Sequence, residues 1–319
     1  MPAEPSIEGW LDVGDRQQIW WGRYGTPTGT PAVVLHGGPG SGCADQWAWF
    51  DLERIAVVLV DQRQCGRSRP HASEPVTDLS ANTTAHLVAD LERLRTHLGI
   101  ERWLVTGISW GTTLALAYAQ AHPTAVTGMV LASVGTTSHA EVDWLTRAMG
   151  RVFPQQWQVF RDALPPGDRD GNLAAAYHRL LIDPDPAVHT PAAAAWCAWE
   201  DTHVAPTPGH QPHPRYADPT FRLAFARIVT WYFAHAAFLP DGQILDQMGR
   251  LADIPAVLIH GRLDLSTPLD AAWQIHRRWP ASRLVILDGA GHGATQAAIR
   301  EAVATLTTAC SRPTQGPVS

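Results

Sequence analysis

The sequence predicts an α/β fold in which helices cover a mostly parallel, doubly wound sheet. Short apolar runs rich in valine, isoleucine and leucine recur along the 319-residue chain, and stretches with helical periodicity lie between them. This alternation is typical of successive β-α-β units. Residues 107–111 read Gly-Ile-Ser-Trp-Gly, directly after one apolar run and directly before a helical stretch. The pattern predicts a strand, a sharp turn that carries a serine, and a helix at this place.

The predicted strands are nearly continuous in apolar residues, which indicates that both faces of the sheet are covered. Two antiparallel strands are expected at 11–13 and 18–21, and the main strands at 32–35, 56–60, 103–106, 129–132, 256–259 and 284–287. Helices between these strands are expected at 84–98, 112–121, 269–278 and 294–309.

The alternation stops between about residues 135 and 253. Loops rich in proline and glycine separate helical patterns there, at 142–152, 173–181, 191–199 and 221–233. The sequence therefore predicts an α/β core of residues 1–134 and 254–319, with a helical cap domain of residues 135–253 inserted after the sixth strand. Because pockets of open α/β sheets form at the carboxyl ends of the strands, a cap placed there would cover the site.

Composition and charge exclude several classes of function. The net charge is −6 without a basic stripe, so no nucleic-acid partner is expected. All 24 cationic residues are arginine, which excludes a lysine Schiff base. The four cysteines and fifteen histidines show no metal-ligand spacing, so neither a metal nor a structural disulfide is expected. The first residues show neither the basic nor the apolar segment of a signal peptide, and no apolar run approaches the ~18 residues that span a bilayer. A reduced, cytoplasmic protein without a signal peptide or membrane contact is therefore expected.

Ser109 is the candidate nucleophile, at the centre of the Gly-x-Ser-x-Gly pattern. A serine hydroxyl needs a base to take its proton, and the base needs an acid to orient it. Asp264 lies just after the predicted strand 256–259, and His292 lies in a glycine-rich turn after the next predicted strand. This chain order of serine, aspartate and histidine is that of α/β hydrolases, so Asp264 and His292 are the predicted acid and base. Asp288 is a rival acid that precedes the turn.

A tetrahedral intermediate needs backbone N–H donors beside the nucleophile. Trp110, directly after Ser109, is one predicted donor of this oxyanion hole. The other is expected in the loop 36–42, which reads His-Gly-Gly-Pro-Gly-Ser-Gly and follows a predicted strand. Gly38 is favoured by position, and Gly42 is the alternative. The loop has neither glycine pattern that cradles phosphates.

These residues lie within motifs that resemble those of the proline iminopeptidases, serine peptidases of the α/β-hydrolase fold. The resemblance covers nearly the whole chain. The loop 36–42 is similar to the family's H-G-G-P-G-G-G, and 107–114 is similar to G-G-S-W-G-S-T-L. Three further segments look like D-Q-R-G-C-G-R-S, W-S-x-W-E and G-A-G-H, namely 61–68, 196–200 and 289–292. Residues 261–264 match G-R-Y-D except at Leu263.

The resemblance implies removal of an N-terminal residue, usually proline, from a peptide or amide. Ser109 would be the nucleophile, His292 the base and Asp264 the orienting acid, with no metal or organic cofactor. The segment 61–68 is expected to be structural, an arginine-anchored loop beside the active site.

The resemblance also implies an amine-binding pocket, and here the chain departs from the family. Family enzymes hold the substrate's free amine with two cap glutamates. The first matches Glu200, and the second has become Val229. A structural ion pair with an arginine, such as Arg227, is the other interpretation of Glu200. The candidates for a replacement acid are Asp201, Asp143 and Glu141.

Further pocket positions follow from the same motifs. A family aromatic becomes Gly135, which is expected to open volume, a family cysteine becomes Thr267, and Phe233 is kept. Trp199 belongs to a group of tryptophans that would line an apolar channel, although each one singly is also expected to pack in the core: Trp144, Trp157, Trp196, Trp199 and Trp231. The loss of an aromatic wall and a charge points away from strict proline specificity.

The sequence therefore predicts a serine hydrolase that cleaves an N-terminal aminoacyl amide bond of proline or another small or apolar residue. Its partner is a peptide or small molecule with a free N-terminal amine. The alternative is an amidohydrolase that removes an aminoacyl group from a bulky apolar natural-product intermediate, such as a polyketide. An esterase or thioesterase is disfavoured by Glu200. A ligand-binding homologue without turnover is disfavoured by the complete set of Ser109, Asp264 and His292.

Overall fold

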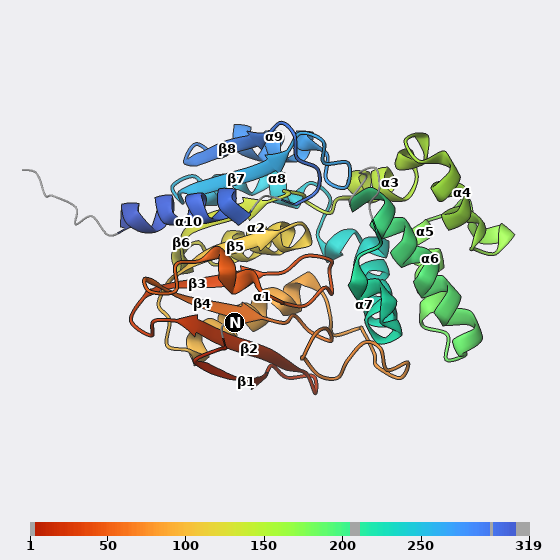
Figure 1. The fold of residues 1–319 in the computed structure, drawn as a ribbon, viewed down its shortest axis with the longest axis horizontal. Coiled ribbons are helices and arrows are strands. Elements are labelled where there is room, and N and C mark those ends of the chain that lie inside the picture. The colour runs from red at the N-terminus through yellow and green to blue at the C-terminus, as the bar shows by residue number, and fades with distance from the viewer. Residues whose placement is uncertain (1–3, 205–210, 294–295, 311–319) are drawn as a thin grey trace, which may run out of the picture.

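One eight-stranded sheet forms the centre of the molecule, with the strand order β1-β2-β4-β3-β5-β6-β7-β8 (Figure 1). The computed structural model describes residues 4–204, 211–293 and 296–310. β2 pairs antiparallel with β1 and β4, and all other pairings in the sheet are parallel. The strands are β1 (Ile7–Asp12), β2 (Gln18–Gly25), β3 (Thr30–Leu35), β4 (Ile55–Val60), β5 (Trp103–Ile108), β6 (Val126–Ala132), β7 (Ala256–Gly261) and β8 (Ser282–Leu287).

Alternate strand residues sort onto two apolar faces, as the pleat of a sheet requires. Val33 and Val58 pack on the face that α1, α2, α8 and α9 cover, whereas Val34 and Val57 pack on the face that α10 covers. The predicted α/β fold with helices on both faces is thereby confirmed. These helices are α1 (Thr84–His97), α2 (Trp110–Ala121), α8 (Gln243–Asp246), α9 (Leu269–Arg277) and α10 (Gln296–Cys310). The predicted start of the last helix at 294 lies outside the described residues.

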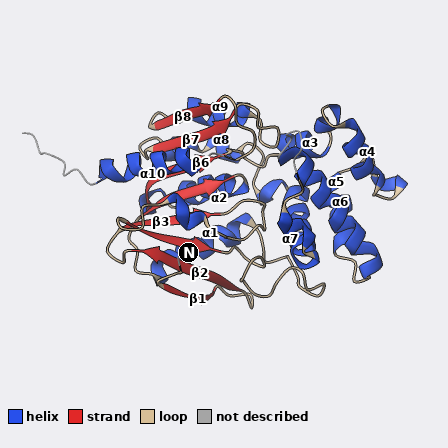
Figure 2. Cartoon of the chain, viewed as in Figure 1, coloured by secondary structure: helices blue, strands red, loops and turns tan. Residues whose placement is uncertain are grey.

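Helices α3 to α7 gather at one end of the sheet (Figures 1 and 2). They enclose an apolar core of their own, which includes Phe160, Trp196 and Phe225 and is distinct from the two sheet cores. The division into two domains at residues 135 and 253 stays a prediction. The helices are α3 (His139–Thr146), α4 (Pro154–Asp162), α5 (Leu173–Leu181), α6 (Pro186–Val204) and α7 (Pro219–Ala234).

The first two of these helices differ from the predicted pattern. The predicted helix 142–152 is α3 followed by a separate 3-10 turn, because Arg147 leaves the helical conformation with φ −130° and ψ −63°. α4 was not among the predicted helices. Phe160 is its only buried residue, so its apolar stripe is too thin to recognise, although Pro154 at its start is a typical helix signal.

Helix α6 begins earlier than predicted. The side chain of Asp185 accepts a hydrogen bond from the Ala187 N–H at 2.8 Å, which caps the new start. Pro191, the predicted start, lies inside the helix instead. Within the described ranges, every helix is too short or too polar to cross a membrane.

Candidate active site

Ser109 lies at the turn between β5 and α2. Its backbone has φ 54° and ψ −125°, a conformation that residues with side chains rarely adopt. Two glycines permit the turn. A Cβ on Gly107 would collide with the carbonyl of Gly111, and a Cβ on Gly111 would collide with the backbone of β3. The turn therefore has the geometry that the Gly-x-Ser-x-Gly pattern predicts, with the serine at its apex.

Ser109, His292 and Asp264 form a continuous chain of hydrogen bonds. His292 Nε2 lies 3.1 Å from Ser109 Oγ, and Nδ1 of the same ring lies 3.0 Å from both carboxylate oxygens of Asp264. Thr267 holds the carboxylate through its backbone N–H at 2.9 Å and its hydroxyl at 2.8 Å. This arrangement can accept the serine proton on the imidazole and stabilise the imidazolium that results.

Charge and burial oppose one another at this pair. Burial acts to raise the pKa of Asp264, but the neighbouring His292 and the hydrogen bonds to the carboxylate hold that pKa below its ordinary value. Burial acts to lower the pKa of His292, and Asp264 outweighs it, so that the pKa of His292 is raised. Each partner thus favours the charged form of the other. The rival acid Asp288 pairs instead with Arg262 at the surface, at 2.5 Å.

A second histidine, His260, braces the turn that carries Asp264. Its Nδ1 accepts a hydrogen bond from the Val134 N–H at 3.0 Å, and its Nε2 donates to the Thr267 carbonyl at 2.6 Å. Burial lowers the pKa of this ring, which keeps it neutral. The only sequence signal for His260 is its place at the end of an apolar strand, and that signal does not separate it from an ordinary core residue.

The loop after β3 approaches the serine through its glycines. A Cβ on Gly37 would lie 3.3 Å from the Cβ of Ser109. Gly38 has φ 111°, and a Cβ on it would meet backbone nitrogens of the same loop at 2.7 and 2.9 Å, so only glycine fits. Gly38 and Trp110 line the cavity into which Ser109 opens. Gly42, the alternative donor, packs against the backbone of another loop.

Ser109 and His292 open into a cavity between the sheet edge and the helices. Its wall combines hydroxyls, two carboxylates, a second imidazole and apolar groups. On the helical side it is lined by Glu141, Val142, Leu145, Glu200, His203 and Phe233. Within the described residues, no group of three histidine, cysteine, aspartate or glutamate side chains could hold a metal ion.

Comparison with known proteins shows the family to which this sequence is related. A family model described as the alpha/beta hydrolase fold matches residues 30–295. A probable proline iminopeptidase of Streptomyces coelicolor is 52% identical over 296 residues, which cover 91% of this chain and 91% of that protein. The proline iminopeptidase of Arabidopsis thaliana is 41% identical over 93% of this chain and 78% of its own length. The chain belongs to the proline iminopeptidase family.

Solved structures agree on the fold. The crystal structure of VinJ superposes with a TM-score of 0.64 at 23% identity, covering 96% of this chain and 99% of that chain. A proline iminopeptidase of Mycobacterium smegmatis gives a TM-score of 0.63 at 22% identity, covering 96% of this chain and 100% of that chain. The α/β-hydrolase fold that the motifs predicted is therefore confirmed.

Four pocket positions expected from the proline iminopeptidases line the cavity, namely Gly135, Glu200, Phe233 and Thr267. The cavity is narrow at Gly135. A Cβ added there would lie 3.1 Å from Thr267 Cγ2 and 3.4 Å from Glu141 Oε2. The glycine therefore lets the walls approach one another, and the predicted gain in volume at this position was wrong.

Two further expected positions, Val229 and Trp199, are not among the residues that line the cavity. Val229 is fully buried in the core of the helical layer. The Trp199 ring stacks on Phe160 with centroids 5.3 Å apart, and its Nε1 donates to the Leu145 carbonyl at 3.1 Å. Successive helix residues point about 100° apart, so Trp199 turns into the helical core while Glu200 turns to the cavity. The prediction that Val229 and Trp199 line the pocket was therefore wrong.

Glu200 is almost fully enclosed, with 14% of its side chain exposed. Burial raises its pKa to about 7, against the opposing charge of Arg215. Arg227 is not its partner. The Arg227 guanidinium donates to the carbonyl oxygens of Ala72 at 2.6 Å and Thr77 at 2.9 Å, and so ties α7 to the loop before α1. Arg227, the arginine named as an example, is therefore not the partner of Glu200 in a structural ion pair.

Of the three acids considered as replacements for a second glutamate, only Glu141 lines the cavity. Its carboxylate already accepts hydrogen bonds from the backbone N–H groups of Thr136 and Thr137 at 2.9 and 2.6 Å. Asp143 lies on the surface, 3.7 Å from Arg147. Asp201 accepts a hydrogen bond from the His213 N–H at 3.1 Å.

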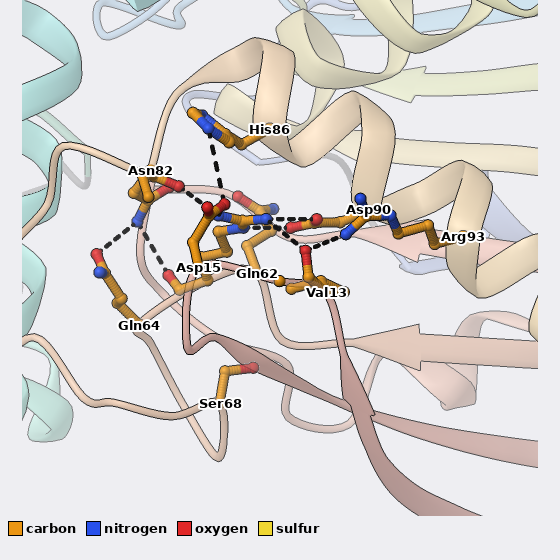
Figure 3. A network of polar contacts seen from close by, with 12 residues as sticks. Val13, Asp15, Gln62, Gln64, Ser68, Asn82, His86, Asp90 and Arg93 are labelled. Atoms are coloured by element: carbon orange, nitrogen blue, oxygen red, sulfur yellow. Dashed lines mark hydrogen bonds and ion pairs between the residues drawn. The ribbon is translucent and has the colours of Figure 1, made fainter.

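The segment 61–68 is anchored by the buried Arg63, in a polar network that includes Asp15, Asn82 and Asp90 (Figure 3). Arg63 donates to both carboxylate oxygens of Asp90, at 2.6 and 2.8 Å, and to Asp15 at 3.1 Å. The Asn82 side chain accepts a hydrogen bond from the Tyr232 hydroxyl at 2.8 Å and donates one to the Arg63 carbonyl at 3.1 Å. The network therefore joins the loop to α1 and α7.

This anchored loop also supports one of the predicted oxyanion donors. The Gln62 side-chain oxygen accepts a hydrogen bond from Trp110 Nε1 at 2.9 Å. The Gln62 N–H donates to His36 Nε2 at 3.1 Å, which steadies the start of the glycine loop. Gln62 thus forms hydrogen bonds on both sides of the predicted oxyanion hole, with Trp110 and with His36 at the start of the glycine loop.

Proposed function

We propose that this protein is a serine aminopeptidase that cleaves the amide bond after a small N-terminal residue with a free amine. One observation carries the proposal. A nearly enclosed carboxylate, Glu200, lines the same cavity as the hydrogen-bonded set of Ser109, His292 and Asp264. The chain belongs to the proline iminopeptidase family, which supports the same reaction.

In the first half of the reaction, Ser109 Oγ attacks the carbonyl carbon of the substrate amide while His292 Nε2 takes the hydroxyl proton. The carbonyl π electrons move to oxygen, and the backbone N–H groups of Gly38 and Trp110 stabilise the oxyanion. The C–N bond then breaks, and His292 gives its proton to the departing amine. An aminoacyl ester on Ser109 remains.

In the second half, water replaces the departed amine. His292 takes a proton from the water as the water oxygen attacks the ester carbon. The tetrahedral intermediate collapses, the bond to Ser109 Oγ breaks, and His292 returns the proton to the serine. The free amino acid leaves. Asp264 keeps its charge throughout and stabilises the imidazolium of His292 in both halves.

Glu200 supplies the preference for a free amine. A substrate ammonium placed beside the carboxylate offsets the cost of burying this charge. The same placement lowers the pKa of Glu200 from its raised value, so binding and ionisation support one another. A substrate without the amine leaves a buried carboxylate unpaired, which disfavours the esterase interpretation.

The acyl group is expected to be small. The cavity is narrow at Gly135, because the side chains of Thr267 and Glu141 lie close to this glycine. The alternative substrate, a bulky apolar natural-product intermediate, was inferred from the changes at Gly135 and Val229 and from a channel that tryptophans would line. Among the described residues, Trp110 is the one tryptophan that lines the cavity, and Trp196 and Trp199 belong to the helical core. That alternative therefore has less support than a short peptide or aminoacyl amide.

A substrate panel tests the proposal. The rates for alanyl, prolyl and leucyl 4-nitroanilides are compared with the rate for 4-nitrophenyl propionate, with Ser109→Ala as the blank. We expect amidase activity, with the alanyl or prolyl compound ahead of the leucyl compound. Ester turnover without any amidase activity would overturn the proposed function. Prolyl hydrolysis far above all others would restore strict proline specificity.

A further inference from the structure

His203 lies in the cavity wall directly beside Glu200. The two residues are three positions apart in α6, a spacing that places side chains on the same helix face. His203 is 3% exposed, and both residues line the cavity that contains Ser109. The ring nitrogens of a buried histidine are polar atoms that need hydrogen-bond partners.

One ring nitrogen is held by a serine. The Ser266 hydroxyl donates its single proton to the His203 carbonyl at 3.1 Å. Ser266 Oγ therefore acts as an acceptor towards His203 Nδ1, which lies 2.8 Å away. Both hydrogen bonds form at once only when Nδ1 carries the proton of the neutral ring, so that Nε2 presents its lone pair.

The other ring nitrogen faces the carboxylate. His203 Nε2 lies 3.6 Å from Glu200 Oε2, beyond hydrogen-bond range. Burial lowers the pKa of His203 to about 3, so the ring is neutral and does not form an ion pair with Glu200. Two acceptor atoms thus lie 3.6 Å apart, on two residues that line the same cavity. No described donor forms a hydrogen bond with either atom.

We propose that His203 Nε2 and the Glu200 carboxylate together hold the substrate's α-ammonium, which makes His203 a specificity-determining residue. This rests on the proposed function and deepens it. One carboxylate balances the single positive charge, and the imidazole supplies a second acceptor without a second negative charge. The place of the second acid is therefore taken by a neutral acceptor rather than by another carboxylate. Ser266 is a positioning residue that fixes the tautomer.

The test separates amine binding from chemistry. His203→Leu is expected to raise KM for alanyl 4-nitroanilide at least about tenfold, the loss of one hydrogen bond to a charged group. The kcat for that substrate and the rate for 4-nitrophenyl propionate, which has the same three-carbon acyl chain without the amine, stay within about twofold. His203→Gln is expected to have a KM between those of the wild type and His203→Leu, because the glutamine amide oxygen is also a hydrogen-bond acceptor.

His189→Leu is the matched control. His189 is also a buried histidine in α6, but it does not line this cavity. The control variant is expected to keep both rates. Ser266→Ala is expected to raise KM for the alanyl substrate about threefold and to spare the ester. An equal loss on both substrates in His203→Leu, or an unchanged KM, would overturn the assignment.

A binding measurement keeps this inference distinct from the proposed function. Alaninamide is tested as a competitive inhibitor of 4-nitrophenyl propionate turnover in the wild type and in His203→Leu. We expect the inhibition constant to rise at least about tenfold in the variant. If the wild type cleaves only esters, the proposed function fails, and this inhibition still decides whether His203 binds amines. If the wild type cleaves alanyl 4-nitroanilide and alaninamide inhibits His203→Leu as strongly as it inhibits the wild type, only the inference fails. If His203→Leu does not fold, the inhibition constant with Ser266→Ala decides, and no change there contradicts the inference.

Discussion

The two walls of the cavity are built on different kinds of element. The strand wall carries Ser109, Asp264 and His292, each in a loop or turn that follows a strand, at the shared carboxyl edge of the sheet. The helical wall carries Glu200 and His203, which project from within α6. The strand wall is joined by hydrogen bonds from serine to histidine to aspartate, whereas Glu200 Oε2 and His203 Nε2 of the helical wall lie 3.6 Å apart without a hydrogen bond between them. The strand wall thus finds its hydrogen-bond partners within the protein, whereas in our proposal the substrate ammonium supplies the partner of the helical wall.

The largest expected effect tests the strand wall. Ser109→Ala removes the nucleophile, so kcat for alanyl 4-nitroanilide is expected to fall by at least about 10⁴-fold. The thermal unfolding midpoint is measured alongside, and a change of only a few degrees shows that the fold is intact. Retention of more than a hundredth of the activity would mean that another group is the nucleophile.

The next effect tests the helical wall. Glu200→Gln keeps the size of the side chain and removes the charge that pairs with the ammonium. We expect KM for alanyl 4-nitroanilide to rise about 100-fold, the cost of losing one partner of a buried charge pair. The rate for 4-nitrophenyl propionate is expected to stay nearly constant. Asp201→Asn, a neighbouring acid that is not among the lining residues, is the control and is expected to change neither.

The pH dependence distinguishes the two walls in the unaltered enzyme. His292 must be neutral to act as a base, and its raised pKa makes every substrate lose rate as the pH falls. Glu200 must be ionised to bind an ammonium, and its pKa of about 7 adds a second loss for free-amine substrates only. Below pH 7, kcat/KM for alanyl 4-nitroanilide is therefore expected to fall about tenfold per pH unit relative to 4-nitrophenyl propionate. Parallel acid limbs for the two substrates contradict the role of Glu200.

A smaller effect tests how the aspartate is held. Thr267→Val removes the hydroxyl that donates to Asp264 Oδ2 at 2.8 Å but keeps the backbone N–H bond. We expect kcat to fall about fivefold on amide and ester substrates alike, because one hydrogen bond of ~1 kcal/mol orients the acid. A change in KM confined to the amine substrate would instead indicate that Thr267 contributes to amine binding rather than to the orientation of Asp264.

The smallest effect tests the narrow end of the cavity. Gly135→Ala adds a Cβ at 3.1 Å from Thr267 Cγ2, so the walls must move apart or the acyl group must shift. We expect a drop of about threefold in kcat/KM for the leucyl 4-nitroanilide and a smaller one for the alanyl compound. The ratio of the two rates is measured. An unchanged ratio would show that the acyl side chain does not reach Gly135.

The strand wall was predictable because local patterns report on it. The Gly-x-Ser-x-Gly pattern and the glycine-rich turn before His292 each announce a sharp turn at a strand end. Parallel strands place such ends at one edge, so positions distant in the chain meet without further information. The chain of hydrogen bonds from Ser109 through His292 to Asp264 follows that logic.

The helical wall was predictable only where a motif covered it. Glu200 lies in the matched segment and lines the cavity, but its neighbour Trp199 does not, because a helix turns adjacent side chains apart. Val229 belongs to the helical core, and Gly135 narrows the space it was expected to open. No pattern around His203 indicated the role that we propose for it, since its partner Ser266 is 63 residues away in sequence.

The sequence by itself determined the α/β fold, the nucleophile turn and the order of serine, aspartate and histidine. These depend on hydrophobic periodicity and on glycines at tight turns, which are properties of short segments. Only the tertiary structure decided which helical side chains reach the cavity, that Arg227 binds backbone carbonyls rather than Glu200, and that Ser266 orients the ring of His203. Those outcomes depend on the rotation and packing of helices against a distant sheet edge, and no short segment encodes that geometry.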